Sequence, residues 1–203
     1  MSPSPILDPA ERAAALAVLD EAPLCHVGFI ESGEPVVLPA LHGRVGDTLY
    51  LHGSPDGALL RAVASGKPLC VNAVLLDGVA VARCPCHSAL NYRSVLFSGR
   101  GHPVNDPTEK ELALRAITER ITPGAWGRGR LPTPADLAGT AVVALAITEV
   151  SLRLRSGPPH DDQADLTLPC WAGVIPLRLA AGPAVPEPGV PAALEVPEVL
   201  GSR

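Results

Sequence analysis

The chain has 203 residues, a net charge of −5 and 18% charged residues, while 47% of its residues are hydrophobic. This length is enough for one domain with a short tail, and a core of that size needs no disulfide or metal to hold it together. Because basic residues neither run together nor alternate with aromatic ones, we expect no nucleic-acid partner.

The N-terminus and the cysteines indicate in which cellular compartment the protein is expected. Residues 1–12 show no basic region followed by an apolar run, so we predict no signal peptide. No apolar stretch reaches about 18 residues, so we predict no membrane span. The five cysteines are an odd number without repeated spacing, and we expect them to be mostly reduced and buried. These features together predict a cytoplasmic protein.

Three helix starts carry a polar capping residue followed by proline. In Asp8-Pro9, Asp106-Pro107 and Thr133-Pro134, an acidic residue also follows two positions after the proline. Such residues satisfy the free backbone N–H groups of a first turn, where proline loses nothing. We predict helices over 9–21, 107–120 and 134–138. A fourth helix is expected to open at Ser54-Pro55-Asp56-Gly57 and to end at Gly66.

Between the helices, apolar and β-branched runs predict strands over 24–30, 35–41, 47–53, 69–76, 79–84, 94–104 and 140–150. Turn residues separate them at 31–34 and 44–46, and Asp77-Gly78 is a strong signal for a type I′ hairpin turn. Strands at short spacing with few helices between them favour an antiparallel barrel over a doubly wound sheet. We therefore expect a mainly β protein with a few helices.

The last part of the chain differs in composition. Residues 183–203 contain five prolines, which predicts an extended or mobile tail. We therefore divide the chain into a domain over 1–182, beginning with the N-terminal helix, and a proline-rich tail over 183–203.

The run Cys84-Pro85-Cys86-His87 raises the question of a metal or redox site. Zinc sites usually pair C-x2-4-C with a second ligand pair farther along, and here the spacing is C-x-C. The same spacing lacks the C-x-x-C geometry of redox pairs. We therefore predict no metal site.

A second candidate is the stretch from Leu49 to Gly57, where a predicted strand ends and a helix begins. Free N–H groups at a helix start favour a phosphate, and Gly53 and Gly57 allow close approach to the backbone. The alternative is a plain strand-to-helix turn. His42, His52 and His87 lie near strand ends, although spacing alone does not bring them together. Motifs of hydrolases and nucleotide-triphosphate enzymes are missing from the sequence.

From Leu24 to about Pro188 the sequence resembles the pyridoxamine 5′-phosphate oxidase-related family, and more narrowly its bacterial flavin-nucleotide-binding branch. The resemblance rests on runs that occur in order: 24–29, 41–44, 47–54, 75–78, Asn91-Tyr92-Arg93-Ser94-Val95, 156–162 and 171–177. It implies an antiparallel split β-barrel and a homodimer with FMN at the subunit interface. A dimer would also bury part of the apolar surface that 47% hydrophobic residues imply.

The resemblance also assigns the cofactor contacts. It places Pro39, Ala40, Leu41 and His42 along the flavin ring, starts the phosphate turn at His52, Gly53 and Ser54, and brings Ser94 and Trp171 near the cofactor. Members of this branch usually have Ser-Arg where this chain has Gly57-Ala58. Losing that arginine removes a charge-assisted contact of about 1.5–3 kcal/mol. Arg61, Arg93 or Arg44 are expected to substitute in part.

The implied function is a flavin-dependent oxidoreductase for a small substrate, with His42 and His87 as candidate catalytic groups because histidine exchanges protons near neutral pH. Synthesis of pyridoxal phosphate itself is disfavoured, since we find no cluster of basic and hydroxyl residues for a substrate phosphate. Related barrels act as nitroimidazole reductases. Two alternatives stay open: a non-catalytic flavin or haem carrier, with His87 as the axial haem ligand, and a degenerate member that has lost its cofactor.

Overall fold

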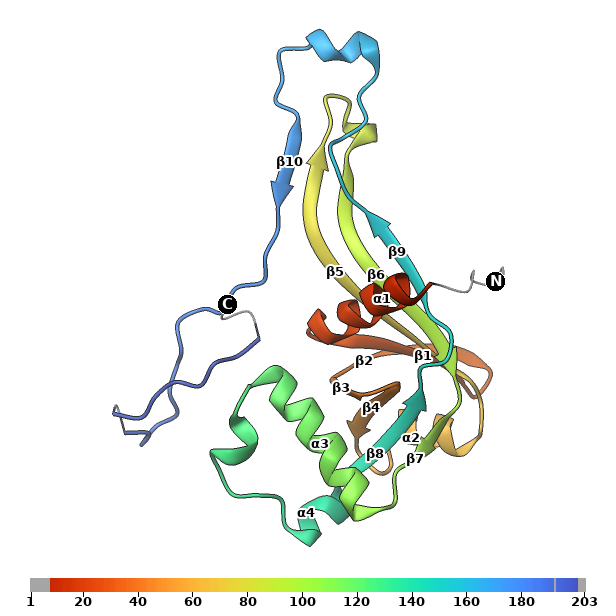
Figure 1. Cartoon of the computed structure of the whole chain (residues 1–203), viewed down its shortest axis with the longest axis vertical. Helices are drawn as coiled ribbons and strands as arrows, with labels where there is room; N and C mark the ends of the chain where they lie inside the picture. The colour runs from red at the N-terminus through yellow and green to blue at the C-terminus, as the bar shows by residue number, and fades with distance from the viewer. Residues whose placement is uncertain (1–7, 192, 201–203) are drawn as a thin grey trace. The chain divides into compact units, whose positions relative to one another are not determined.

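The computed structural model describes residues 8–191 and 193–200 (Figure 1). The chain divides into two compact units, and each is assembled from three separate pieces. Unit 1 contains the described residues up to 22, residues 72–96 and residues 149–179. Unit 2 contains residues 23–71, residues 97–148 and the described residues from 180 onward. The two units are described in turn.

Unit 2 carries a hairpin and a four-stranded antiparallel sheet. The hairpin joins β1 (Cys25–Glu31) to β2 (Glu34–Ala40), and its turn has positive φ at both Ser32 and Gly33, as the predicted turn over 31–34 requires. The sheet has the order β3-β4-β8-β7. Its strands are β3 (His42–Val45), β4 (Thr48–Gly53), β8 (Ala141–Ala146) and β7 (Gly101–Pro103).

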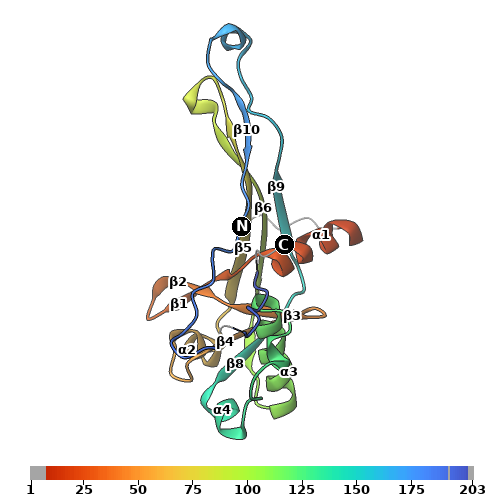
Figure 2. The same cartoon turned by 90° about the vertical axis from the view of Figure 1, so that its left-hand side faces the viewer.

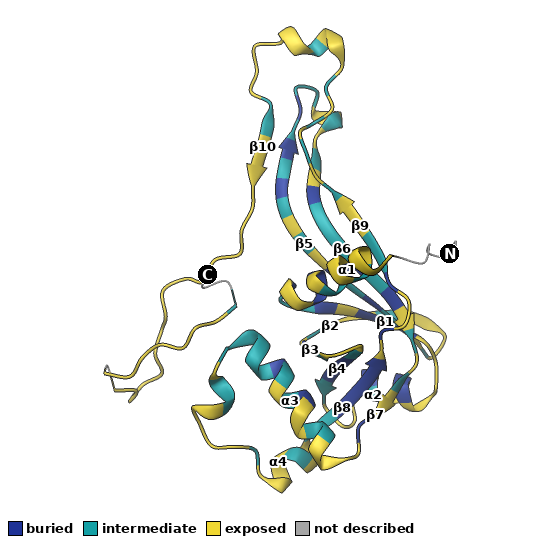
Figure 3. Ribbon diagram, viewed as in Figure 1, coloured by how far each residue is buried: buried dark blue, intermediate teal, exposed yellow. Residues whose placement is uncertain are grey.

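Three helices accompany these strands: α2 (Ala58–Ala64), α3 (Pro107–Ile121) and α4 (Pro134–Gly139). Side chains from α3, β4, β8 and the segment after β7 form a buried cluster. Figure 3 shows the buried residues along β4 and β8. The members of the cluster are Tyr50, Val104, Ala113, Ile117, Val142 and Ala144. At Gly43, a Cβ atom would lie 2.6 Å from the backbone nitrogen of Ile117, so only glycine lets α3 approach β3 this closely.

Unit 1 consists of α1 (Pro9–Glu21) and long antiparallel strands. Strands β5 (Leu69–Val81) and β6 (Ala89–Gly99) lie beside each other, β9 (Ser151–Arg155) pairs with β6, and β10 (Gly173–Pro176) pairs with β5 (Figure 2). The first three residues of β5 and the last three of β6 belong to unit 2. Short 3-10 turns occur at Pro85–His87 (η1) and Gln163–Thr167 (η3) in this unit, and at Ala125–Gly127 (η2) in unit 2.

The predicted capping residues of the helices are confirmed. The side chains of Asp8, Asp106 and Thr133 each accept a hydrogen bond from the backbone N–H three residues later, and the caps at Asp8 and Thr133 are complete capping boxes. The fourth helix forms where predicted but begins later, with Gly57 as a cap that has no side-chain hydrogen bond. The mainly β, antiparallel class is confirmed, and neither sheet closes on itself within the described residues.

The hairpin predicted at Asp77-Gly78 is wrong. Residues 69–81 form one continuous strand, and Gly78 pairs with Pro176 of β10. A Cβ atom at Gly78 would lie 2.9 Å from the carbonyl oxygen of Ile175, while the backbone N–H of Leu177 donates to the carbonyl of Asp77 at 3.1 Å. The glycine therefore serves the close approach of a neighbouring strand, and the sequence signal for a turn is misleading here.

Other strand boundaries also differ from prediction. The predicted turn at 44–46 is mostly strand β3, and the chain turns instead at Gly46, where φ is +58°. The strand predicted over 94–104 is interrupted between β6 and β7. The strand predicted over 140–150 ends at Ala146, although the N–H of Ile147 still donates to the carbonyl of Asp47, and β9 begins at Ser151. The short strand β10 was not predicted.

The proline-rich tail and the cysteines were also subjects of prediction. Described residues beyond 182 contain no helix or strand, although the N–H of Leu200 donates to the carbonyl of Ile121 at 2.9 Å. All five cysteines are free, as expected, but only Cys25 is buried, so the expectation that most are buried is wrong. None of the described helices is long and apolar enough to cross a membrane.

Candidate functional site

The segment predicted to lie along a flavin ring joins β2 to β3. Pro39 and Ala40 end β2, Leu41 lies between the strands and is 40% exposed, and His42 opens β3. His42 is 1% exposed and pairs with Leu51 of β4, so its imidazole is buried. The segment therefore combines an exposed apolar side chain with a buried titratable one.

The predicted phosphate turn follows β4. His52 is half-buried, its Nδ1 has no hydrogen-bond partner within the described part of the chain, and burial lowers its pKa, so the imidazole is neutral near pH 7. Gly53 has open space where a Cβ would stand, and Ser54 is exposed. The N–H of Gly57 donates to the carbonyl of Ser54 at 2.9 Å, which closes the turn before α2.

Arg61, the predicted substitute for the missing phosphate arginine, is engaged by acceptors of the protein itself. Its Nε and Nη2 donate to one carboxylate oxygen of Glu31 at 2.9 and 2.7 Å, and its Nη1 donates to the carbonyl of Asp56 at 2.5 Å. The guanidinium is 59% exposed. Arg61 therefore lies at the predicted turn, but an incoming anion would have to compete with Glu31 for it.

On β6, Arg93 and Ser94 are both held by neighbours in unit 1. The Arg93 guanidinium donates to Asp77 at 2.7 Å and to Glu21, the last residue of α1, at 2.5 and 2.8 Å. These hydrogen bonds raise the pKa of Arg93, and the bond from Arg93 lowers the pKa of Glu21. The Ser94 hydroxyl accepts from the amide of Asn72 at 3.0 Å. Arg93 thus ties α1 to the strands and does not offer an unpaired charge.

The remaining predicted residues, His87 and Trp171, also lie in unit 1. His87 ends the turn η1 and has a buried Nδ1 without a hydrogen-bond partner among the described residues. Trp171 is 62% exposed, and its ring would lie 3.1 Å from a Cβ placed at Gly173. The predicted site residues thus fall into two groups: those up to Arg61 belong to unit 2, and His87, Arg93, Ser94 and Trp171 belong to unit 1.

Several residues of unit 1 were missed by sequence reasoning. The carboxylate of Asp161 accepts from both the backbone N–H and the guanidinium of Arg83, each at 2.7 Å. Buried Asn91 donates to the carbonyl of Gly157 at 3.0 Å and accepts from Arg155 at 2.7 Å. The runs 91–95 and 156–162 carried the family resemblance, and that was the only signal that these residues belong together.

A hollow of about 300 Å³ lies beside the Arg83–Asp161 pair. Its lining comes entirely from unit 1, mostly from the loop after β9; it consists of Arg83, Pro158, Pro159, His160, Asp161, Leu166, Ala172 and Gly173. Burial alone would raise the pKa of the Asp161 carboxyl, but the hydrogen bonds from Arg83 and from the N–H of Cys84 outweigh it and hold the pKa below its usual value. The carboxylate is therefore charged near neutral pH.

A family model described as pyridoxamine 5′-phosphate oxidase matches residues 11–154, more than half of the chain, so the chain belongs to this family. The split-barrel class expected from the sequence is thereby confirmed. A comparison with curated proteins gives no match.

Two similar solved structures cover nearly the whole chain. The flavocytochrome Anf3 from Azotobacter vinelandii is 38% identical with a TM-score of 0.83, over 93% of this chain and 88% of that one. The FAD and heme binding protein from Mycobacterium smegmatis is 39% identical with a TM-score of 0.83, over 92% and 91%. An FAD-binding protein from Mesorhizobium loti, 19% identical over 74% and 96% with a TM-score of 0.51, shares the fold.

Proposed function

We propose that this protein binds a flavin nucleotide and acts as a flavin-dependent oxidoreductase on a small molecule. The observation that carries the proposal is the 38–39% identity, over more than nine-tenths of this chain, to a flavocytochrome and to an FAD- and haem-binding protein. A bound flavin supplies one- and two-electron transfer, whereas the protein binds and orients it. The second relative favours FAD over the FMN that the family resemblance implies.

The phosphate turn is the part of the chain that can be tested for fit to a flavin. Ser54 offers an exposed hydroxyl, Gly53 leaves its backbone open to approach, and His52 carries a buried ring nitrogen without a partner among the described residues. This donor set suits a phosphate oxygen. The cation expected beside it is Arg61, whose present partner is Glu31. We infer that a flavin phosphate binds here by drawing Arg61 away from that carboxylate.

The other proposed contacts follow the family pattern. Pro39, Ala40, Leu41 and His42 are proposed to face the ring, and so are Ser94 and Trp171, whose side chain is 62% exposed. His42 and His87 are the proposed proton-carrying groups for the substrate. Since His42 is 1% exposed, it would exchange its proton with a substrate at the ring and not directly with solvent.

The first experiment is an absorption spectrum of the purified protein, followed by chromatography of the chromophore released on denaturation. We expect a flavin spectrum and about one flavin per chain. Comparing the released compound with FMN and FAD decides between the two nucleotides. A colourless protein that also fails to bind either added nucleotide contradicts the proposal and leaves the degenerate barrel.

Charge variants then test the phosphate turn. Arg61→Ala is expected to weaken flavin binding about tenfold, the usual effect of losing one charge-assisted hydrogen bond. Glu31→Gln is expected to tighten it, because it releases Arg61 from its competing partner. Arg130→Ala, which removes an exposed arginine paired with Asp136 elsewhere in unit 2, is the matched control and should leave binding unchanged. Equal affinities for all three variants would place the phosphate elsewhere.

Haem is the second candidate cofactor, because both similar proteins are described as flavocytochrome or haem-binding. His87 is the proposed axial ligand, since its Nδ1 is buried and lacks a partner in the described chain. A Soret band in the purified protein, lost in His87→Ala but not in His102→Ala, would support this assignment. Reductase assays with nitroaromatic and quinone substrates then separate an oxidoreductase from a carrier.

A homodimer belongs to the same proposal. Apolar side chains are widely exposed on the strands and loops of unit 1; they include Leu76, Leu90, Leu154, Leu166, Trp171, Ile175 and Leu179. Exposed apolar surface of this kind marks an interaction surface. Sedimentation analysis should therefore find a dimer at micromolar concentration, and a chain that stays monomeric throughout would contradict the dimer.

A further inference from the structure

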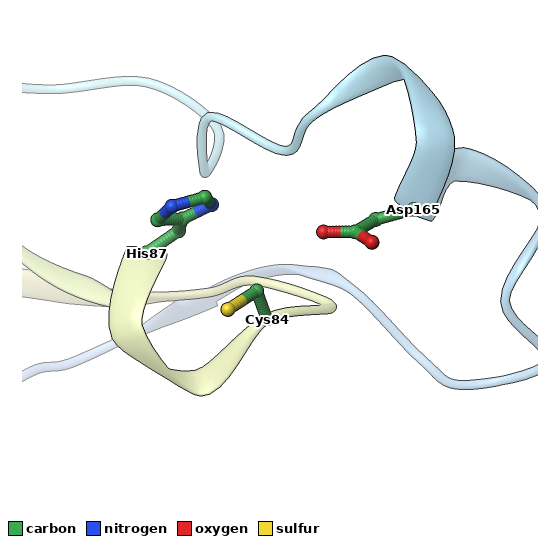
Figure 4. A group of neighbouring side chains, drawn as sticks. All are labelled: Cys84, His87 and Asp165. Carbon is green, nitrogen blue, oxygen red and sulfur yellow. The ribbon is translucent and has the colours of Figure 1, made fainter.

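In unit 1, three side chains of different chemistry gather at the turn that follows β5. The ligand atoms of Cys84, His87 and Asp165 all lie within 4.8 Å of one another. Figure 4 shows the thiol and imidazole on the turn η1 and the carboxylate of Asp165 reaching toward them from the facing segment η3. All three residues are partly buried. A thiol, an imidazole and a carboxylate are a recognised donor set for zinc, whose bonds of about 2.0–2.3 Å require the three ligand atoms to draw together around the ion.

Backbone hydrogen bonds hold the main chain at all three donors. The N–H of His87 donates to the carbonyl of Cys84 at 3.0 Å, and this single 3-10 turn brings both side chains to the same side. The Ser88 hydroxyl accepts from the N–H of Ala82 at 3.0 Å and holds the end of the turn. Asp165 is fixed in the same way, because its N–H donates to the carbonyl of Asp162 at 2.9 Å.

The facing segment is anchored next to the site. Asp161 accepts from the backbone N–H and the guanidinium of Arg83, the residue before Cys84. This contact holds the start of the segment carrying Asp165 against the turn carrying Cys84 and His87. The two segments that carry the donors are therefore held together, and the three side chains must move closer to one another to meet around an ion.

An unsatisfied atom points to a missing ligand. Nδ1 of His87 is buried, and within the described residues it finds no hydrogen-bond partner. A buried polar atom without a partner carries a free-energy cost. A metal ion bound to Nδ1 removes that cost. An ion bound to Nε2 removes it too when a water molecule forms a hydrogen bond with Nδ1. The sequence prediction of no metal rested on the C-x-C spacing, which does not reveal a third donor as distant in the chain as Asp165.

We propose that Cys84, His87 and Asp165 bind one Zn²⁺ ion, with the fourth position left to water or substrate. Binding converts the Cys84 thiol to a thiolate and releases its proton, so affinity rises with pH. The ion joins the turn η1 to the segment η3. Zinc binding here excludes both axial haem ligation by His87 and a proton-carrying role for this residue, so His87 serves only one of these three proposals at a time.

The experiment uses the full, untagged chain, stripped with a chelator and then titrated with ZnCl2 or with Co²⁺ as a spectroscopic substitute. We expect about one ion per chain, together with the ligand-field and thiolate charge-transfer bands of tetrahedral cobalt. Zinc should also slow hydrogen exchange in residues 163–167. Hydrogen exchange does not depend on the flavin, whose absorbance is recorded separately. Failure of the zinc proposal therefore does not imply failure of the flavin proposal.

Matched variants complete the test. Cys84→Ser, His87→Gln and Asp165→Asn should each lower affinity for Zn²⁺ at least about tenfold. Cys86→Ser and Asp162→Asn change exposed neighbours of the same chemistry and should have no effect. Melting curves of the stripped variants control for misfolding, and zinc-induced exchange protection of the unmutated chain provides a test that needs no variant.

Four results would overturn the proposal. Three concern the metal: cobalt binding to the unmutated chain without thiolate bands, unchanged exchange in 163–167 when zinc is added, and a loss of affinity in the two control variants as large as in the three ligand variants. A Soret band that depends on His87 but survives in Cys84→Ser and Asp165→Asn would also overturn it, because His87 would then belong to haem alone.

Discussion

In unit 2, side chains from α3, β4 and β8 pack into a buried cluster around Tyr50, and Gly43 allows α3 to rest against β3 with almost no gap. Unit 1 also buries the inner face of α1, at Ala15, Val18 and Leu19. Away from that helix its strands are tied by ion pairs and amide hydrogen bonds, and many of their apolar side chains are exposed. The buried cluster of unit 2 thus rests on packing, whereas polar contacts join distant segments of unit 1.

This difference matters for function because the two kinds of contact respond to different changes. The stability of a packed apolar interface depends on side-chain volume and little on pH or charge. Polar contacts such as Arg83–Asp161 are sensitive to charge and to proton concentration. The proposed zinc ligands lie among these polar contacts, whereas the proposed phosphate turn lies on the packed unit. Three predictions test the comparison.

The largest effect is expected for Gly43→Ala in unit 2. The new Cβ would lie 2.6 Å from the nitrogen of Ile117 and 2.8 Å from the carbonyl carbon of Ala116, and neither backbone atom can move without shifting α3. We expect a loss of about 1–3 kcal/mol or more in the free energy of unfolding. Denaturant unfolding measures it. Gly129→Ala, where a Cβ meets nothing within 4 Å, is the control, and an equal loss there would refute the packing argument.

A local and pH-dependent effect is expected for Asp161→Asn in unit 1. The folded pKa of Asp161 lies below its usual value, so the charged carboxylate stabilises the fold above the unfolded pKa of about 3.9, and this contribution is lost as pH falls through the folded pKa. At neutral pH the variant should exchange the Arg83 amide on the order of tenfold faster. In the unmutated chain, protection of this amide from exchange should fall as pH falls through the folded pKa of Asp161, and the variant should not show this change. Unchanged exchange would show that Asp161 does not anchor the segment.

The smallest effect is expected for Glu21→Gln, which removes one of two carboxylates from Arg93. The Glu21 carboxylate is 54% exposed and Asp77 remains as a partner, so the loss should be about 0.2–1 kcal/mol. Asp77→Asn should cost more, because its carboxylate is less exposed. Thermal unfolding of both variants and of the double variant measures the pair, and a Glu21 effect larger than that of Asp77 would contradict this ranking.

Local signals in the sequence predicted local structure well. The capping residues Asp8, Asp106 and Thr133 identified three helices because a cap acts within four residues of its own position. The turn at Ser32-Gly33 was equally legible. By contrast, Asp77-Gly78 was misread, because the glycine is needed by a strand that arrives almost a hundred residues later in the chain. Nothing near Gly78 in the sequence reveals that neighbour.

The candidate sites were likewise predicted where a local pattern marks them and missed where distant segments meet. His52, Gly53 and Ser54 were found because a strand-to-helix turn is a local pattern, and their surroundings agree with it. The engagement of Arg61 by Glu31 was not predictable, since it depends on how β1 and α2 lie in the folded unit. The group Cys84, His87 and Asp165 was missed for the same reason, as Asp165 arrives from beyond β9.

The division of each unit among three chain segments has a consequence for biosynthesis. Helix α1 is synthesised well before residues 149–179, which are among its partners in unit 1. Unit 2 likewise waits for residues up to 148. Neither unit can mature before its last segment is made, so strand edges stay unpaired while the chain between is synthesised. Such a chain should depend on chaperones during translation, and no single cut between residues will yield either unit as an independent fragment.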